Sequence, residues 1–214
     1  MSDTPAAAPR PGKASGTASG KGPAKAPGKA RTRLLAAAAR RFYADGVTAT
    51  GIDTITAEAG VAKMSLYNNF SSKADLVMAY LDARHEEWLG MYRHRLEEAR
   101  DGRGGVLAVF DAYADHAAFA YEHGFRGCGL LNAAAELPAG HDGRDVVRRH
   151  KEEVESLLRG HLGELLPGRP EEAGAMAEQL SFLLEGAMAR AGLEGAGTRL
   201  EHARTMAANL LDRL

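Results

Sequence analysis

Residues 50–70 read TGIDTITAEAGVAKMSLYNNF, and this stretch decides the fold of the N-terminal part of the chain. Ile52 and Ile55 give a first short helix one buried face, because residues three apart lie on the same side of a helix. Gly60 allows a sharp turn, since glycine adopts backbone angles that strain other residues. Leu66 then returns to the core and holds a second short helix against the first. Two short helices joined by a glycine-containing turn indicate a helix-turn-helix.

The second helix of such a unit lies in the major groove of DNA, and its first residues meet base edges. The side chains available for this contact are Lys63, Met64, Ser65 and Asn68. Ordinary helical hairpins also place a glycine between two short helices, so the alternative of a purely structural hairpin depends on the flanking sequence.

The flanking sequence predicts helices and no strand of useful length. Thr50 is expected to cap the first helix of the motif, and Ser71 or Ser72 the long helix that follows. Beyond the motif, helical spacing predicts segments at about 30–45, 73–100, 106–123, 130–136, 145–166, 171–192 and 199–214. The predicted fold is all-α with about nine helices. A three-helix helix-turn-helix domain occupies residues 29–75, and a helical ligand-binding and dimerisation domain occupies residues 76–214.

Composition narrows the class of protein. Of the 214 residues, 45% are apolar, enough for a packed core. No run approaches the roughly 18 apolar residues that a membrane helix needs, and the first thirty residues lack a secretory signal, so a cytoplasmic location without membrane attachment is expected. A single cysteine, Cys128, excludes an internal disulfide and a cysteine-based zinc site. The histidine spacing predicts no metal site, and no motif predicts a cofactor.

The net charge of −1 hides an asymmetry along the chain. Residues 1–75 have a balance of +6 and residues 76–214 a balance of −7. A basic N-terminal part suits a polyanion such as DNA. Residues 1–28 contain almost only small residues, proline and lysine, which predicts a disordered basic tail. This tail either keeps the protein soluble or adds phosphate contacts.

The residues in and around the motif, and the spacing between them, resemble those of the tetracycline-repressor (TetR) family. The similarity covers about residues 30–80 without a gap. The matching pattern is Phe42-x2-Asp45-Gly46, then Thr50-x-Ile52-x2-Ile55-x3-Ala59-Gly60-Val61, then Leu66-Tyr67-x2-Phe70-x2-Lys73-x2-Leu76. The resemblance implies a homodimer with N-terminal DNA-binding heads, helical bodies that hold a ligand pocket, and repression relieved by the ligand.

The resemblance also implies roles for single residues. Thr50 would cap the first motif helix and touch a phosphate. Tyr67 would contact the DNA backbone or a thymine methyl group, and Lys73 would pair with a phosphate. Asn69 stands where the family often has His or Tyr, which makes that contact shorter and uncharged. Together with Lys63, Met64, Ser65 and Asn68 these residues form the predicted DNA-binding set; core or solvent-exposed roles for Tyr67, Lys63 and Lys73 stay open.

The last two helices, about 171–192 and 199–214, are the predicted homodimer interface. Both show apolar stripes, and small residues gather near the end of the first: Gly186, Ala187, Ala189, Ala191 and Gly192. Small residues let helices approach closely, as in a four-helix bundle formed by two subunits. The alternative is that both stripes face the core of the monomer.

A pocket for a small-molecule effector is predicted among the helices between residues 76 and 185. Polar groups among its candidates could orient a ligand, and for the aromatic ones a plain core role is the alternative. Cys128 lies beside Arg126, which leaves a reactive and an inert thiol both open. The predicted ligand-binding residues are Trp88, Tyr92, Tyr113, His116, Phe125, Cys128, Asn132 and Glu136.

These features predict a ligand-responsive transcriptional regulator that binds double-stranded operator DNA and is released from it by a small molecule. A transcriptional activator and a helical protein-binding module without DNA activity remain alternatives. The chain has no phosphate loop, dinucleotide fingerprint or nucleophile elbow, so an enzyme is not expected.

Overall fold

The computed structural model describes residues 28–119 and 121–214, and this part of the chain forms nine helices and no strand. The predicted all-α fold is confirmed. The predicted basic tail lies outside the described residues except for Gly28. The helices are α1 (Lys29–Asp45), α2 (Ile52–Ala59), α3 (Lys63–Asn69), α4 (Lys73–Leu96), α5 (Gly102–Ala117), α6 (Gly129–Ala135), α7 (Asp142–Leu165), α8 (Pro170–Glu194) and α9 (Thr198–Leu211).

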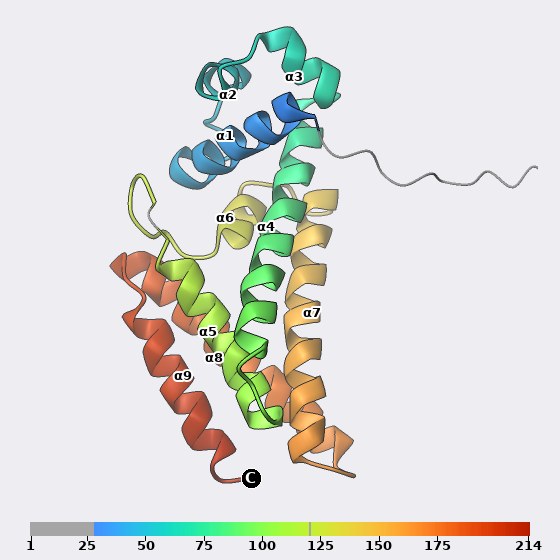
Figure 1. Ribbon diagram of the computed structural model, residues 1–214, viewed down its shortest axis with the longest axis vertical. Helices are drawn as coiled ribbons and strands as arrows, with labels where there is room; N and C mark the ends of the chain where they lie inside the picture. Colours follow the sequence, from blue (N-terminus) through green and yellow to red (C-terminus); the bar gives the residue numbers. More distant parts are fainter. Residues whose placement is uncertain (1–27, 120) are drawn as a thin grey trace, which may run out of the picture.

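Helices α1, α2 and α3 pack together at one end of the molecule, and we call this unit the head (Figure 1). Its core is formed by Leu34, Ile55 and Leu66, which are completely buried. Gly60 ends α2 in the left-handed conformation, with φ +59°, and its N–H bonds to the carbonyl of Ala57. The turn that the glycine predicts is therefore present, and α3 begins three residues later.

The long helix α4 leaves the head and continues through the rest of the molecule, which we call the body (Figure 1). Ser72 caps its first turn by accepting a hydrogen bond from the N–H of Asp75 at 3.0 Å. Twenty-four residues give α4 a length of about 36 Å. Near its start, the ring of Tyr80 packs edge-on against Phe42 of α1, so α4 joins the cores of head and body.

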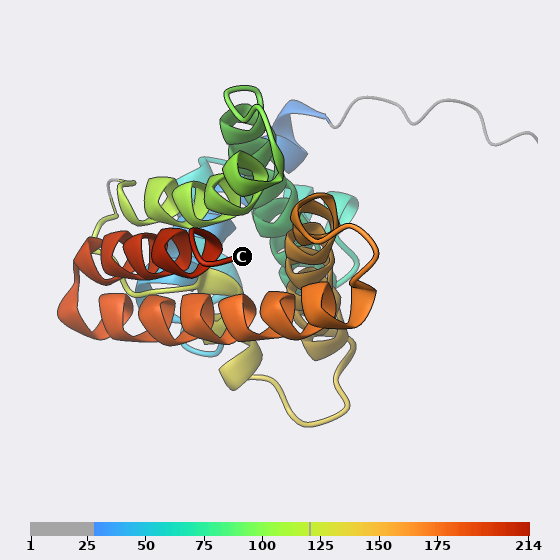
Figure 2. The same cartoon turned by 90° about the horizontal axis from the view of Figure 1, so that it is seen from below.

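In the body, α5 packs against α4, α7 and α9, and α7 packs against α8. Helices α8 and α9 lie side by side and run across the axis of α7 (Figure 2). The short helix α6 contacts α1, α4 and α7, so it lies beneath the head. Leu158, Leu162, Leu180 and Leu184 are completely buried where α7 meets α8.

Several helix boundaries differ from the prediction, most of all those of α5. The segment expected at 106–123 is α5, which begins at Gly102 because the Asp101 carboxylate accepts a hydrogen bond from the N–H of Gly104. It ends at Ala117, and the aromatic residues Tyr121 and Phe125 pack from a loop instead. The last helix ends at Leu211 rather than at 214.

The apolar stripes of α8 and α9 face the core of the monomer, as the alternative to a dimer surface predicted. The stripe residues lie in the core of the monomer: Leu180, Leu184, Ala191, Leu200, Ala203, Ala207 and Leu211. The opposite face of α8 is apolar as well, with Phe182 67% and Leu193 90% exposed. On α9, Met206 is 53% exposed.

Candidate nucleic-acid interface and effector cavity

Helix α3 presents a row of side chains to solvent at the outer end of the head. Leu66 is fully buried and anchors the helix, whereas Met64 is 69% and Tyr67 48% exposed. Lys63 and Asn68 are exposed beside them. Large apolar and aromatic side chains are costly to leave in water, and here they stand on the helix that the motif assigns to the major groove.

Three of the predicted DNA contacts also bond within the head. The Lys63 ammonium lies 2.8 Å from Asp53, and this hydrogen-bonded partner raises the pKa of Lys63. The Asn69 amide donates to the Ser65 carbonyl one turn earlier on α3, at 2.7 Å. Lys73 donates to the Thr48 carbonyl at 3.3 Å and so joins the start of α4 to the loop before α2.

The expected capping and phosphate role of Thr50 is wrong. The N-cap of α2 is Gly51, and Thr50 is only 2% exposed. Its hydroxyl donates to the Gly46 carbonyl at 2.6 Å, with the Arg41 carbonyl at 3.3 Å. Thr50 therefore closes the turn after α1 instead of facing DNA.

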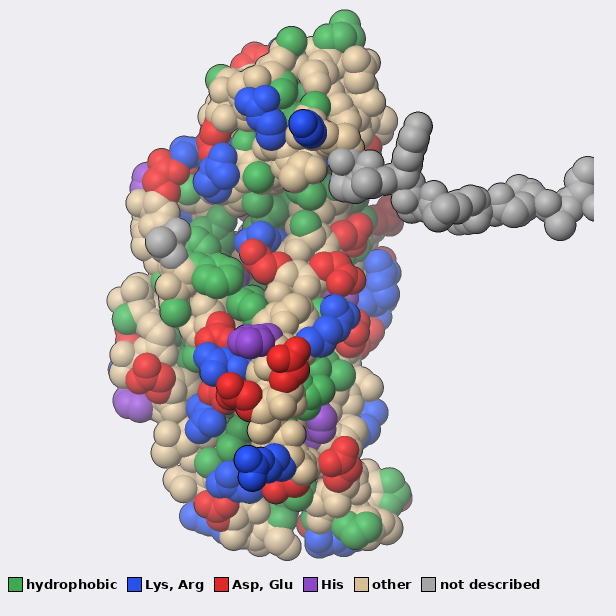
Figure 3. Space-filling view, viewed as in Figure 1, with side chains coloured by type: hydrophobic (Ala, Val, Ile, Leu, Met, Phe, Trp, Pro, Cys, Tyr) green, Lys and Arg blue, Asp and Glu red, His purple; other side chains and the backbone are tan. Residues whose placement is uncertain are grey.

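Arginines of α1 brace the motif, a role that the sequence analysis missed. Arg33 donates to the Gly60 carbonyl at 3.2 Å, and the Arg31 guanidinium lies 4.8 Å from the centre of the Phe70 ring. Lys and Arg side chains are visible on the head together with acidic ones, and the visible face of the body also carries both signs of charge (Figure 3). A positive head suits phosphate contacts.

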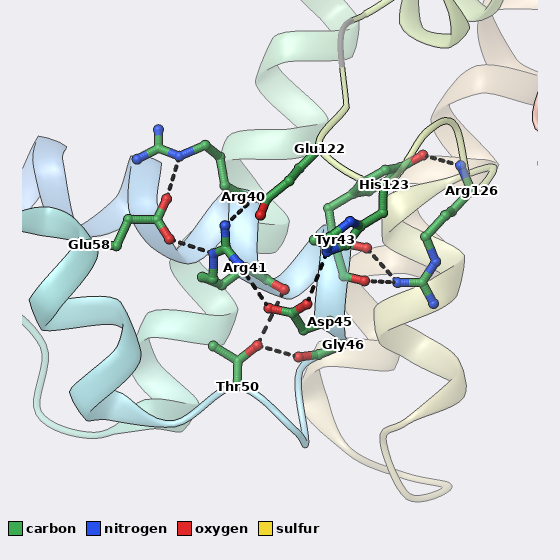
Figure 4. A network of polar contacts seen from close by, with 11 residues as sticks. Arg40, Arg41, Tyr43, Asp45, Gly46, Thr50, Glu58, Glu122, His123 and Arg126 are labelled. Carbon is green, nitrogen blue, oxygen red and sulfur yellow. Dashed lines mark hydrogen bonds and ion pairs between the residues drawn. The ribbon is translucent and has the colours of Figure 1, made fainter.

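A polar network joins the C-terminal end of α1 to the segment before α6 (Figure 4). The Tyr43 hydroxyl accepts a hydrogen bond from the Arg126 N–H at 2.7 Å and donates to the Gly127 carbonyl at 3.1 Å. In return, the Arg126 guanidinium donates to the carbonyls of Tyr43 and Ala44, at 2.8 and 2.5 Å. These bonds satisfy carbonyls at the end of α1, where no helical partner exists.

Arg41 is the charged centre of the same network (Figure 4). It pairs with Glu58 of α2 at 2.5 Å, with Asp45 of α1 at 3.3 Å, and with Glu122 in the loop after α5. One guanidinium thus connects α1, α2 and the body. A movement of the loop after α5 would therefore change the contact between Glu122 and Arg41 of the head.

Glu136 is not a ligand-orienting group, and its assignment to the effector pocket is wrong. Its carboxylate accepts hydrogen bonds from the backbone N–H groups of Val47 at 3.0 Å and Thr48 at 2.6 Å. Burial works against the charge, but these bonds to Thr48 and Val47 lower the pKa of Glu136. Glu136 therefore links the end of α6 to the loop of the head.

Replacing Glu136 with Gln is expected to lower the free energy of unfolding by about 1 kcal/mol at neutral pH, because the charge-assisted bonds weaken. A lowered carboxyl pKa stabilises the fold above the ordinary pKa, and that stabilisation disappears as the pH falls through the lowered value. Urea unfolding at a series of pH values should show the gap between the two proteins closing in acid. Glu98→Gln, at an exposed position, is the matched control; a gap that does not change with pH contradicts the role.

Gly192 sets how closely α8 approaches this network. A Cβ at Gly192 would lie 2.7 Å from the Gly127 nitrogen and 2.8 Å from the Arg126 carbonyl carbon, both backbone atoms. Gly192→Ala is therefore expected to destabilise the protein by about 1–3 kcal/mol. Gly160→Ala, on α7 with no atom within 4 Å of the new Cβ, should instead stabilise it by about 0.5–1 kcal/mol. Thermal unfolding of both variants measures the opposite signs; the same sign for both would contradict the close approach.

Half of the predicted effector residues surround one small cavity in the body. Trp88, Tyr113, His116 and Cys128 line it, and its volume of about 20 Å³ is close to that of one water molecule. Arg84, His150 and Met188 also line it, and the sequence analysis missed them. No sequence pattern connects these three residues, because they belong to three different helices, α4, α7 and α8.

The other predicted effector residues lie outside this cavity. Tyr92 stacks on Trp88, with ring centres 5.7 Å apart, and its hydroxyl lies 2.7 Å from His161. Phe125 is buried beside the His116 ring. The Asn132 amide donates to the Arg126 carbonyl at 3.0 Å. These three residues support the walls and do not line the cavity itself.

A buried lysine stands behind the cavity. The Lys151 ammonium lies 2.7 Å from Glu185, 3.2 Å from the Tyr113 hydroxyl and 3.6 Å from the Cys128 sulfur. Burial works against the ammonium, yet the contacts with Cys128, Tyr113 and Glu185 raise the pKa of Lys151 above its ordinary value. Cys128 is buried, and its contact with Lys151 was not apparent from the sequence.

Among the helices of residues 28–119 and 121–214, none is both long and apolar enough to span a lipid bilayer. Within the same stretches, His, Cys, Asp and Glu side chains form no group of three or more that could hold a metal ion.

Comparison with known proteins agrees with this geometry. The family model described as "Bacterial regulatory proteins, tetR family" matches residues 34–80, which cover most of α1, all of α2 and α3, and the start of α4. A TetR-family transcriptional regulator from Streptomyces coelicolor superposes with a TM-score of 0.75 and 32% identity, covering 86% of this chain and 96% of that one. The chain belongs to the TetR family. A TetR regulator from Chloroflexus aurantiacus, at 26% identity, has a TM-score of 0.74 and covers 86% and 94% of the two chains.

Curated relatives of the helix-turn-helix type match over shorter stretches. The transcriptional activator FasR of Mycolicibacterium smegmatis is 35% identical over 101 residues, which is 47% of this chain and 44% of FasR. The transcriptional regulator TtgR of Pseudomonas putida is 43% identical over 56 residues, or 26% and 27% of the two chains. These matches span less than half of each relative. The chain is a member of a family of DNA-binding transcriptional regulators.

Proposed function

We propose that this TetR-family protein binds a near-palindromic operator as a homodimer and represses transcription until a small molecule releases it. The observation that carries the proposal is the outer face of α3. There, Lys63, Met64, Tyr67 and Asn68 are exposed while Leu66 holds the helix in the core. A recognition helix needs this division between an anchored face and a reading face.

The proposed homodimer uses the outer face of α8 with part of α9. Ala175, Phe182, Gly186, Ala189 and Leu193 recur along this face at intervals of three to seven residues. An exposed apolar row of this kind supports an interface between two copies. Two heads reading half-sites about 34–36 Å apart would multiply affinity for a palindrome.

The proposed effector acts on the junction between head and body. Helix α4 contributes Arg84 and Trp88 to the cavity and begins in the head, while Tyr43 and Glu136 tie the head to the start and the end of α6. A ligand that opens the cavity would displace these elements together. For release from DNA, the ligand must bind the DNA-free form more tightly; a hundredfold preference corresponds to about 2.7 kcal/mol.

Selection of bound sequences from random duplex DNA tests this function. We expect a near-palindromic site whose affinity falls steeply as salt rises, because phosphate contacts release counterions. A promoter fused to that site then reports repression or activation, and activation would agree with the name of the relative FasR. A dimer that ignores every duplex at low ionic strength, but captures a partner protein, would point to a protein-binding module instead.

A further inference from the structure

One face of α4 carries three buried polar groups that lack partners. Among the described residues, four buried side-chain atoms have no hydrogen-bond partner, and three of them are the Tyr80 hydroxyl, Arg84 Nε and Trp88 Nε1. These residues are four apart, so they lie on successive turns of one helix face. Tyr80 and Trp88 are 1% and 5% exposed. An unsatisfied buried donor costs about 1–3 kcal/mol, so three in a row call for a ligand.

The cavity described above lies against these groups. Arg84 and Trp88 line it, together with Gly129 at the start of α6. A Cβ at Gly129 would lie only 3.0 Å from the Tyr80 hydroxyl, so this hydroxyl packs against the residue that begins α6. Arg84 Nε and Trp88 Nε1 can only donate hydrogen bonds, so the missing partner must supply acceptor atoms.

A larger space adjoins the cavity on the other side of Arg84. This cleft of about 420 Å³ lies between α1 and the loop after α5, and its walls include Ala36, Ala39, Tyr43, Phe119 and Tyr121. Arg84 lines both spaces, so a change of its rotamer would join them. Hydrophobic side chains gather on the visible face between head and body (Figure 3). The joined space is of the size that holds a small organic molecule.

The free Nε of the Arg84 guanidinium favours a ligand group that accepts hydrogen bonds and carries negative charge. The cleft is also lined by one further cation and one carboxylate, Arg40 and Glu122. Arg84 pairs with Glu87 at 2.7 Å through Nη1, which leaves its Nε free, and Lys151 stands behind the cavity on Glu185. The cavity histidines are neutral: burial, with the charges of Arg84 and Lys151, lowers the pKa of His116 to about 4. Burial likewise lowers the pKa of His150 to about 3. Because a neutral imidazole forms no ion pair, Arg84 is the charged partner for the carboxylate of a bound acid.

We propose that the effector is a small aromatic carboxylic acid, whose carboxylate accepts hydrogen bonds from Arg84 Nε and Trp88 Nε1. Its ring lies in the cleft against the aromatic walls and touches α1 of the head. The inference rests on the proposed function only in that it names the ligand of the same cavity. A ligand wedged between α1 and Arg84 would displace the head from its bonds to the body.

Trp88 is the single tryptophan of the chain, so its fluorescence reports on the site directly. The purified full chain is titrated with 3-phenylpropionate and with the matched neutral amide, 3-phenylpropionamide. We expect the acid to change the Trp88 emission and to bind about tenfold more tightly than the amide, because bonds to a charged acceptor are stronger. Equal affinity for both compounds, or no binding of either at millimolar concentration, overturns the assignment.

Variants locate the carboxylate. Arg84→Met is expected to weaken binding of the acid about 10- to 100-fold and to leave the amide nearly unchanged. Arg84→Lys keeps the positive charge but removes Nε, so its affinity for the acid should fall less than that of Arg84→Met. Arg93→Met, at an exposed position of the same helix, is the matched control. Trp88→Phe, followed by calorimetry, tests the indole N–H. Unchanged acid binding in Arg84→Met overturns the proposal, and thermal unfolding checks that each variant is folded.

A parallel measurement separates this inference from the proposed function. Binding of the ligand-free protein to selected duplex DNA is followed by fluorescence anisotropy. Failure to bind any DNA contradicts the proposed function but leaves the Trp88 titration valid. Operator binding that 3-phenylpropionate does not weaken, although the acid occupies the site, contradicts the acid as effector. Release of the operator by the acid and not by the amide supports both.

Discussion

Replacing Tyr67 with Ala is expected to lower the affinity for the operator about 30- to 1000-fold while the dimer stays folded. Tyr67 is 48% exposed on the outer face of α3, so its loss removes DNA contacts and little core. Loss of a direct contact costs about 1–2 kcal/mol, and a homodimer loses it twice. Fluorescence anisotropy with the selected operator measures the change, and sedimentation confirms the dimer.

Two further variants sharpen this test. Tyr67→Phe keeps the ring, so the part of the loss that it retains separates the hydroxyl from the apolar contact. Arg159→Ala, which removes an exposed cation from α7 in the body, should leave the affinity unchanged. Tyr67→Ala protein that binds the operator as tightly as the unaltered protein would remove Tyr67 from the interface.

Replacing Glu185 with Leu is expected to lower the free energy of unfolding by about 3 kcal/mol. The carboxylate lies 2.7 Å from the Lys151 ammonium, and both side chains are only about a quarter exposed or less. Without Glu185 the ammonium keeps the Tyr113 hydroxyl and the Cys128 sulfur as neighbours, and neither balances its charge. Breaking a buried ion pair costs more than removing both partners.

The double variant Lys151→Met with Glu185→Leu is the control for this prediction. Two apolar residues of similar size should recover most of the lost stability, since no uncompensated charge remains. Urea unfolding of the two single variants and the double variant gives the interaction energy. Additive losses in the double variant would show that the pair contributes only through packing.

Local sequence signals were reliable where neighbours along the chain supply the partners. The turn at Gly60 needs only its own positive φ and the carbonyls one turn before it. Ser72 caps α4 through the N–H group of Asp75, three residues away. Such features depend on the backbone conformation of a few neighbouring residues, and the types of those residues determine that conformation.

Predictions from the sequence failed where the hydrogen-bond or ion-pair partner of a side chain lies far away along the chain. Glu136 resembled a pocket residue, but its N–H donors are 88 and 89 residues earlier. Thr50 resembled a cap, but its hydroxyl turned to the end of α1, and the loop between helices decides that direction. Lys151 carried no signal, because its three partners come from α5, α8 and the segment before α6.

By itself the sequence determined that the chain is helical, that a glycine-centred helix-turn-helix lies at its N-terminal end, and that Leu66 faces inward. Helical periodicity and a left-handed turn follow from chemistry within a few residues. Only the tertiary structure decided which apolar side of α8 is core, which groups hold the head on the body, and which donors on α4 lack partners. Those outcomes depend on which surfaces meet when helices pack, and residue spacing does not specify that meeting.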